Sequence, residues 1–190
     1  MGELFTSFDD AWSHFVAREE PLESFFDQFP EDDSVEAEGW LIVPPTEVKR
    51  EVRRLQAALE NVAGLEPIPE HFLHVWLRGR HGADVEALAQ ANPFPVVYRN
   101  VNCFPTAVVV EAQAQQLEDV AAPPDFLPHM TIAVIRGRPE VAPVRAAVTP
   151  LRDTDLGTHV VDELARIAFP AGRTTVLQPW SVIERRSLRR

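Results

Sequence analysis

The spacing of apolar residues along the chain predicts several short strands interspersed with a few helices. The clearest helical period lies between Thr46, a suitable N-cap, and Gly64, a suitable stop. Within it, apolar residues recur every three to four positions, so that one face of a helix is apolar. These residues are Val48, Val52, Leu55, Leu59 and Val62.

Alternation with a period of two, or a short apolar run bounded by Pro and Gly, indicates strands elsewhere. Strands are predicted at residues 39–45, 71–80, 94–104, 105–113, 128–138, 163–169 and 174–185. Shorter helical patterns lie at residues 84–91, 114–120 and 139–149. Because several strand pairs are joined by short turns, this order favours a mixed or antiparallel α+β fold over a doubly wound sheet.

Residues 8–29 have the pattern of an amphipathic helix that follows Ser7 as N-cap and is interrupted by a proline. The acidic segment that comes next, up to residue 38, is typical of a solvated linker. We therefore expect an acidic helical arm and linker over residues 1–36 and a globular domain over residues 37–190. The arm packs on the domain, or it serves as a regulatory flap or a dimer contact. Its apolar face would carry Phe8, Trp12, Phe15 and Val16.

The formal net charge of −11 is concentrated at the N-terminus. Residues 1–38 hold twelve Asp or Glu and one Arg, whereas residues 39–190 hold seventeen acidic and seventeen basic residues. The body of the chain is therefore neutral and free to form a local positive site for a small anion or one RNA end. Long-range attraction of a long duplex nucleic acid is not expected.

No apolar run is long enough for a membrane span, and the acidic N-terminus lacks the basic and apolar regions of a signal peptide. Cys103 is the single cysteine, which suits a reducing compartment because no internal disulfide can form. We therefore expect a cytoplasmic protein without a membrane partner. The chain has neither a Gly-rich phosphate loop nor a compact set of zinc ligands, so we expect no cofactor and no metal.

Two segments, HVWL at 74–77 and HMTI at 129–132, share a design in which a histidine begins an apolar strand. Successive side chains of a strand point to opposite faces, so His74 shares a face with Trp76, and His129 shares a face with Thr131. The aliphatic residues between them would be buried. Two such strands facing each other across a cleft would bring the two imidazoles together.

Paired histidines suit the cleavage of a phosphodiester. One imidazole can remove a proton from the attacking oxygen while the other protonates the leaving oxygen, because histidine titrates near neutral pH. The hydroxyl of Thr131 can donate a hydrogen bond to a nonbridging phosphate oxygen. Arg78 falls on the strand face of His74 and is a candidate phosphate contact. No metal is required, because the histidines carry out the proton transfers.

These motifs resemble those of the 2H phosphoesterase superfamily, the group of bacterial 2′-5′ RNA ligases and 2′,3′-cyclic phosphodiesterases. The pattern of that family, which occurs twice, is a histidine, any residue, Thr or Ser, and an apolar residue. Residues 129–132 fit it fully, whereas residues 74–77 have Trp76 in place of Thr or Ser. The likeness in the order of elements runs from about residue 37 to residue 188.

The resemblance implies a bilobal α+β fold of two mostly antiparallel sheets, backed by helices around a central cleft. It also implies hydrolysis of 2′,3′-cyclic phosphates, or handling of 2′-5′ linkages at RNA or nucleotide ends. His74 and His129 would be the acid/base pair, and Thr131 a phosphate contact. We assign His129 as the base and His74 as the acid. The partner would be a nucleotide 2′,3′-cyclic phosphate or an RNA terminus.

Trp76 leaves two interpretations open, because an indole has one donor, no acceptor and far more bulk than threonine. In one, the ring contacts the phosphate or stacks on a nucleobase. In the other, the pocket has diverged, and the chain is a catalytically weak or inactive module that binds a nucleotide or RNA end. A further alternative is an interaction protein in which both motifs are ordinary core strands and the acidic arm is the functional part.

Overall fold

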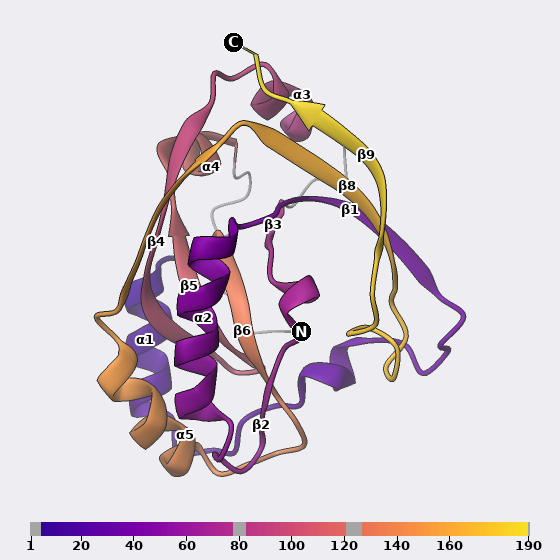
Figure 1. Ribbon diagram of the computed structural model, residues 1–190. Coiled ribbons are helices and arrows are strands. Elements are labelled where there is room, and N and C mark those ends of the chain that lie inside the picture. Colours follow the sequence, from indigo (N-terminus) through magenta and orange to yellow (C-terminus); the bar gives the residue numbers. More distant parts are fainter. Residues whose placement is uncertain (1–4, 78–82, 121–126, 190) are drawn as a thin grey trace.

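The computed structural model describes residues 5–77, 83–120 and 127–189, in which one large sheet dominates (Figure 1). Every strand pairing recorded in these ranges is antiparallel, which confirms the predicted α+β class. The order across the sheet is β7-β4-β5-β6-β3-β1-β8-β9, with β2 beside β6. The strands are β1 (Glu36–Ile42), β2 (Leu65–Pro67), β3 (Val75–Leu77), β4 (Phe94–Phe104), β5 (Ala107–Gln113), β6 (His129–Ile135), β7 (Asp155–Val161), β8 (Glu163–Pro170) and β9 (Ser181–Ser187).

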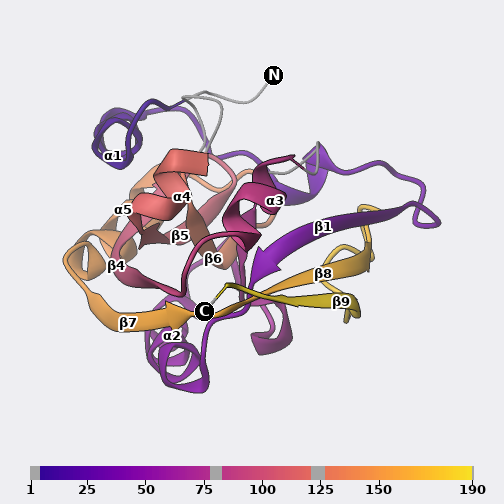
Figure 2. The same ribbon diagram turned by 90° about the horizontal axis from the view of Figure 1, so that it is seen from above.

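The sheet has two halves, which meet at the strands of the two histidine motifs. One half consists of β7, β4, β5 and β6, and the other of β3, β1, β8 and β9, so that they extend to opposite sides in Figure 2. Between β3 and β6 the described register contains the pair Val75–Met130. The two sheets expected from the sequence are therefore halves of one continuous sheet. Because their backbones pair, the motif strands are neighbours within it and do not face each other across a cleft.

Helices cover both faces of the half that contains β4, β5 and β6, and Figure 2 shows α1 and α2 on opposite sides of it. α2 begins at Thr46 itself, and Pro45 occupies the N-cap position without a side-chain hydrogen bond. The helix buries the predicted stripe of Val48, Val52, Leu55 and Leu59. The helices are α1 (Phe8–Ala17), α2 (Thr46–Leu59), α3 (Ala83–Ala89), α4 (Gln115–Val120) and α5 (Val141–Val148), with 3₁₀ turns η1 (Phe25–Gln28), η2 (Glu70–Phe72) and η3 (Thr149–Leu151).

The N-terminal arm packs into the same core as the rest of the chain. Ser7 caps α1 as predicted, because its Oγ accepts a hydrogen bond at 3.0 Å from the backbone N–H three residues on. Phe15 and Leu22, at 3% and 1% exposure, belong to the main core cluster. Val16, which was predicted on the buried face, is 44% exposed. Ala11 and Phe15, which are four residues apart, define the buried face instead.

The sequence pattern missed two strands and misplaced the ends of others. β2 is too short to show alternation, and the edge strand β7 contains Gly157 at a φ of +95°. The strand predicted at 174–185 begins only at Ser181, and the predicted linker contributes its last residues to β1. Short strands and edge strands bury few side chains, so they leave a weak hydrophobic pattern.

Candidate active site

The two motif strands present their polar residues on one face of the sheet. Val75 of β3 and Met130 of β6, each next to a motif histidine, are 0% exposed. The predicted alternation of buried and accessible positions is thereby confirmed. The four predicted site residues on the opposite face are half-buried: His74, Trp76, His129 and Thr131.

The strand register brings the two motifs together. Because β3 and β6 are antiparallel and Val75 pairs with Met130, position 74 lies toward 131 and position 76 toward 129. Each histidine is therefore diagonal to the other on adjacent strands. Their proximity has an electrostatic consequence, since positive charge on His129 lowers the pKa of His74.

Each histidine makes the same hydrogen bond to its own backbone. His74 Nδ1 lies 2.6 Å from the carbonyl oxygen of Phe72, and His129 Nδ1 lies 2.6 Å from that of Leu127. A carbonyl oxygen only accepts, so Nδ1 carries the hydrogen in both rings. In the neutral ring, Nε2 is then the nitrogen that can take a proton from a substrate. The structure thus orients the two imidazoles in the same tautomer.

Burial displaces the pKa of both histidines downward. It lowers the pKa of His74 to about 4, with a smaller contribution from charge on His129 and an opposing one from the Phe72 carbonyl. Burial also lowers the pKa of His129, against the opposing effect of the Leu127 carbonyl. At neutral pH without a ligand, both imidazoles are therefore uncharged.

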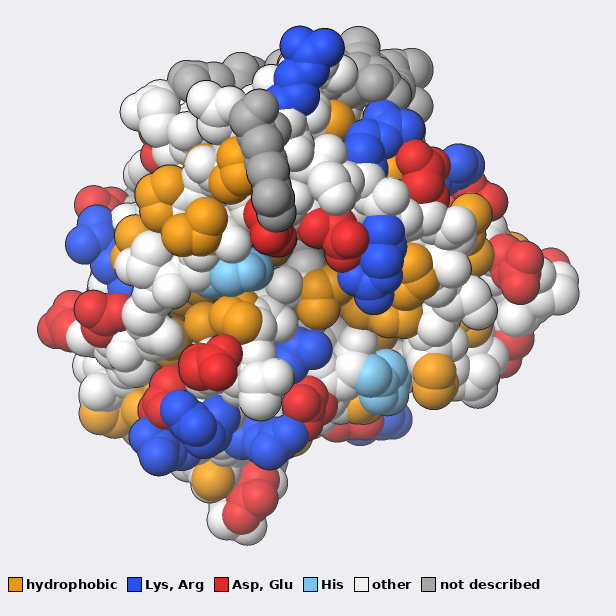
Figure 3. All heavy atoms as spheres, turned by 45° about the horizontal axis from the view of Figure 1, so that its top comes forward, with side chains coloured by type: hydrophobic (Ala, Val, Ile, Leu, Met, Phe, Trp, Pro, Cys, Tyr) orange, Lys and Arg blue, Asp and Glu red, His pale blue; other side chains and the backbone are white. Residues whose placement is uncertain are grey.

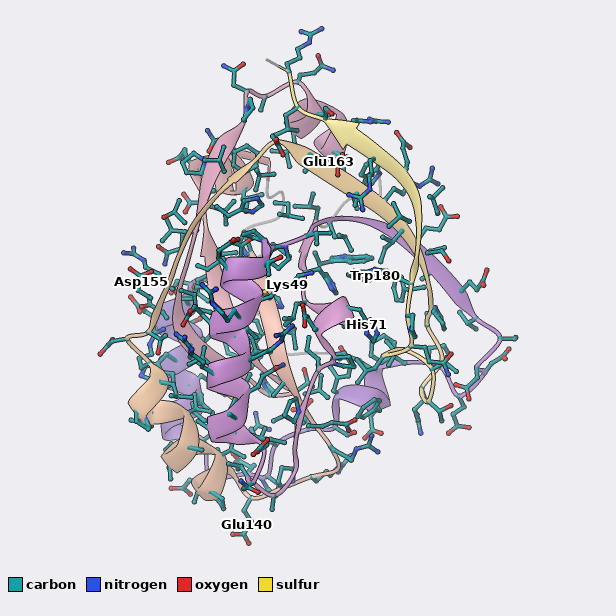
Figure 4. All side chains as sticks on the ribbon, viewed as in Figure 1. Lys49, His71, Glu140, Asp155, Glu163 and Trp180 are labelled. Carbon is teal, nitrogen blue, oxygen red and sulfur yellow. The ribbon has the colours of Figure 1, made fainter. Side chains whose placement is uncertain are left out.

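Aromatic rings surround His74. The ring centroid of Phe72 lies 5.1 Å from that of His74, and the ring of Trp180, just before β9, lies at 5.0 Å. Trp180 also stacks on Phe72 at 5.6 Å. Figure 4 shows Trp180 pointing inward above η2, which carries His71. The sequence pattern did not identify Trp180, because nothing local marks it as a neighbour of a residue more than one hundred positions away.

Trp76 lies between His74 and Phe169 and extends over Gly39. Its ring centroid is 5.9 Å from that of His74, and it meets Phe169 of β8 edge-on at 5.5 Å. On the neighbouring strand β1, a Cβ at Gly39 would stand 2.1 Å from the indole. The indole therefore occupies the space that any side chain at position 39 would need.

The arginines that follow the motifs lie in different settings. Arg78, the predicted phosphate contact, and Arg80 lie outside the described residues. Arg136 forms an ion pair with Glu66 and lies over the ring of Phe26, 4.8 Å from its centroid. Arg136 thus stabilises packing at the end of β6 opposite to His129.

Opposite charges are interspersed on the face shown in Figure 3. Ion pairs also join the acidic arm and the strand that follows it to the body: Arg152–Asp9, Arg173–Glu31 and Arg166–Glu38. In the described part of the chain, no three His, Cys, Asp or Glu side chains gather closely enough to hold a metal ion. No helix there is long and apolar enough to cross a membrane.

No protein-family model matches the sequence, and no curated protein matches it. Several solved structures match the fold. TT0787 of Thermus thermophilus has a TM-score of 0.56 at 19% identity, over 80% of this chain and 97% of that chain. A crystal structure of a phosphoesterase has a TM-score of 0.53 at 16% identity, over 82% of this chain and 100% of that chain.

E. coli LigT matches in complexes with two nucleotides. The ATP complex has a TM-score of 0.55 at 17% identity, over 80% of this chain and 98% of that chain. The 3′-AMP complex has a TM-score of 0.53 at 17% identity, over 90% of this chain and 99% of that chain. At these identities the comparisons establish the fold.

Proposed function

From the fold of the 2H phosphoesterases, which this chain shares with E. coli LigT and TT0787, we propose that it is a metal-independent phosphoesterase. It hydrolyses 2′,3′-cyclic phosphates or handles 2′-5′ linkages at the ends of RNA or nucleotides. One observation carries the proposal. His129 begins β6 and His74 directly precedes β3, on the same face of the sheet, and each Nδ1 is bonded to a backbone carbonyl, which leaves Nε2 as the nitrogen that can accept a proton.

In the proposed hydrolysis, a water oxygen bonds to phosphorus while the bond from phosphorus to one ribose oxygen breaks. One imidazole Nε2 takes the proton of the water, and the other imidazole, as imidazolium, gives its Nε2 proton to the leaving ribose oxygen. Exchange with solvent then restores the original protonation states. The hydroxyl of Thr131 donates to a nonbridging oxygen, where negative charge develops.

The mechanism needs one proton on the pair, and the anionic substrate favours its uptake. Charge on His129 is among the causes that lower the pKa of His74, and the interaction is mutual, so the pair holds one proton more readily than two. The assignment of His129 as the base and His74 as the acid stays a prediction. The pair titrates as a unit, so that a pH–rate profile reports two apparent values for the pair.

Trp76 and Trp180 form the aromatic side of the proposed site next to His74, where a nucleobase can stack. The nucleotides bound to LigT, ATP and 3′-AMP, support a nucleotide or an RNA end as the ligand. Arg78 stays a predicted phosphate contact. We place the activity in residues 37–190, with residues 1–36 as an arm.

A cytoplasmic location belongs to the same proposal. Cys103 is a buried free thiol, and burial raises its pKa far above the usual range, so it is neither a disulfide partner nor a ready nucleophile.

The test is hydrolysis of 2′,3′-cyclic nucleotides in the presence of EDTA. We expect turnover by the wild type and losses on the order of 10²–10⁴-fold in His74→Ala and in His129→Ala. His159→Ala is the matched control, because His159 lies on the edge strand β7. Activity that survives both substitutions would refute the histidine pair, and activity abolished by EDTA would indicate a metal. Ligand binding without turnover would indicate a binding module, which the comparisons do not favour.

A further inference from the structure

The N-terminal arm lies on the same face of the sheet as His129. Asn102 of β4, Val109 of β5 and Thr131 of β6 are register partners, so their side chains share that face. On this face, Asn102 Nδ2 donates to the carbonyl oxygen of Phe8, in the first turn of α1, at 2.8 Å. Figure 2 shows α1 over β4 and β5 on the side opposite to α2. The arm thus reaches the site from the β4 side.

A series of rings connects the arm to the imidazole of His129. Phe104, the last residue of β4, meets His129 edge-on, with ring centroids 4.9 Å apart and planes at 88°. Two arm residues stack on Phe104: Phe5 at 5.8 Å and 13°, and Phe8 at 6.4 Å and 6°. Phe5 is 9% exposed, so this arrangement is packed away from solvent.

Charged contacts hold the arm in this place. Arg152, which follows η3, forms ion pairs with Asp9 of α1 and with Glu111 of β5. Its guanidinium also lies over the ring of Trp12, 5.1 Å from the centroid. α1 is therefore fixed to the sheet over β4 and β5.

We propose that the arm completes the site, because Phe5 and Phe8 press Phe104 against the imidazole of His129 and so hold that ring in its Nδ1-bonded orientation. Phe104 is a positioning residue, and Phe5 and Phe8 act through it. The hydrogen bond to Leu127 fixes one edge of the imidazole, and the ring of Phe104 limits its rotation. The catalytic consequence rests on the proposed function, whereas the positioning does not.

In the described part of the chain, two titratable groups neighbour His129 across the strand register. Glu111 of β5 is its register partner, and its carboxylate accepts hydrogen bonds from Arg152, Asn100 and Gln113. His74 of the β3 segment is the other. Loss of the Phe104 ring would admit water to the imidazole without removing either group.

The test uses the full-length chain with labelled histidines, and NMR titration of His74 and His129 as the readout. In Phe104→Ala and in Phe5→Ala/Phe8→Ala we expect the His129 midpoint to rise toward about 6.5, the value of an exposed histidine, because the ring gains solvent. The His74 midpoint should stay in place. Cyclic-nucleotide turnover should fall on the order of 10-fold or more in kcat, with little change in KM.

Three further variants serve as controls for this test. Phe29→Ala removes an arm ring that packs on Phe25 and should leave both midpoints unchanged. Phe104→Tyr keeps the ring and should restore the wild-type titration, while Phe104→Leu replaces the alanine variant if that one does not fold. An unchanged His129 midpoint in folded ring variants would overturn the proposal. A wild type without turnover would refute the proposed function, and the His129 titration would still decide what the arm does.

Discussion

At the residue scale, Trp76 and Gly39 form a matched pair on neighbouring strands. The indole lies where a side chain of residue 39 would project, and Phe169 closes its other side. A large ring at position 76 is thus compatible with the sheet because β1 has no Cβ at this point. The histidine beside it keeps its backbone hydrogen bond to Phe72.

This pairing predicts a non-additive response to substitution. Gly39→Ala should destabilise the protein by about 1–3 kcal/mol, because the added methyl group forces the indole to move. Trp76→Thr should cost at most about 3 kcal/mol, as the ring is half-buried, and should preserve kcat, because both histidines remain. In the Trp76→Thr background, Gly39→Ala should cost less than about 1 kcal/mol. Urea unfolding of the wild type, the two single variants and the double variant measures these costs. An equal cost of Gly39→Ala in both backgrounds would contradict the predicted coupling between the two residues.

At the element scale, the attachment of α1 to the sheet depends on a buried carboxylate. Glu111 is 2% exposed, and Arg152 Nη1 donates to its Oε1 at 2.6 Å. Asn100 and Gln113 donate to the other oxygen, at 3.1 and 2.9 Å. A carboxylate that is removed from water must be compensated in this way, so the network decides whether α1, β4 and β5 can pack together.

Replacing Arg152 alone should therefore destabilise the protein more than replacing Arg152 and Glu111 together. Arg152→Met leaves Glu111 buried without its ion-pair partner and should cost about 3 kcal/mol or more, whereas Arg152→Met/Glu111→Gln should cost less. Arg166→Met is the control, because Arg166 pairs with Glu38 on an exposed surface and should cost under about 1 kcal/mol. Denaturant unfolding gives all three values. A cost for Arg152→Met no greater than that of the control would show that the network is dispensable.

At the scale of the whole molecule, the acidic arm and the neutral body form one folded unit. Phe15 and Leu22 of the arm share the main core with the sheet, and Arg152 and Arg173 of the body pair with acidic residues of the arm. The molecule also keeps two imidazoles uncharged on one face of its central strands, which links its stability to pH.

The direction of this pH dependence follows from the lowered pKa values of His74 and His129. Above about 6.5, the value in the unfolded chain, both rings are neutral in either state and stability is unaffected. As the pH falls below it, the unfolded chain takes up protons first, so stability is lost progressively down to about 4, where His74 in the folded protein also charges. The loss from His74 is at most about 3 kcal/mol.

Urea unfolding between pH 7 and pH 4.5 measures this loss. His74→Asn/His129→Asn should flatten the dependence, because an amide can donate to the same carbonyls without titrating. A steep acid loss that persists unchanged in this variant would assign the effect to other groups.

Much of the fold could be predicted from the sequence, because the period of burial along an element is a local property. The stripe from Val48 to Leu59 indicated α2, and alternation indicated β4, β5 and β6. The same alternation identified the strand faces on which His74 and His129 lie. β2 and β7 were missed, since a short strand and an edge strand bury too little to leave a pattern.

The sequence by itself therefore determined the α+β class. It also identified His74 and His129 as the candidate pair and the strand face on which each lies. Only the tertiary structure decided that β3 and β6 are neighbours in one sheet, that Gly39 makes room for Trp76, and that Trp180 and Phe104 flank the two imidazoles. These facts depend on the register between segments far apart in the chain. That register is set by the packing of the whole core, and no local pattern of residues encodes it.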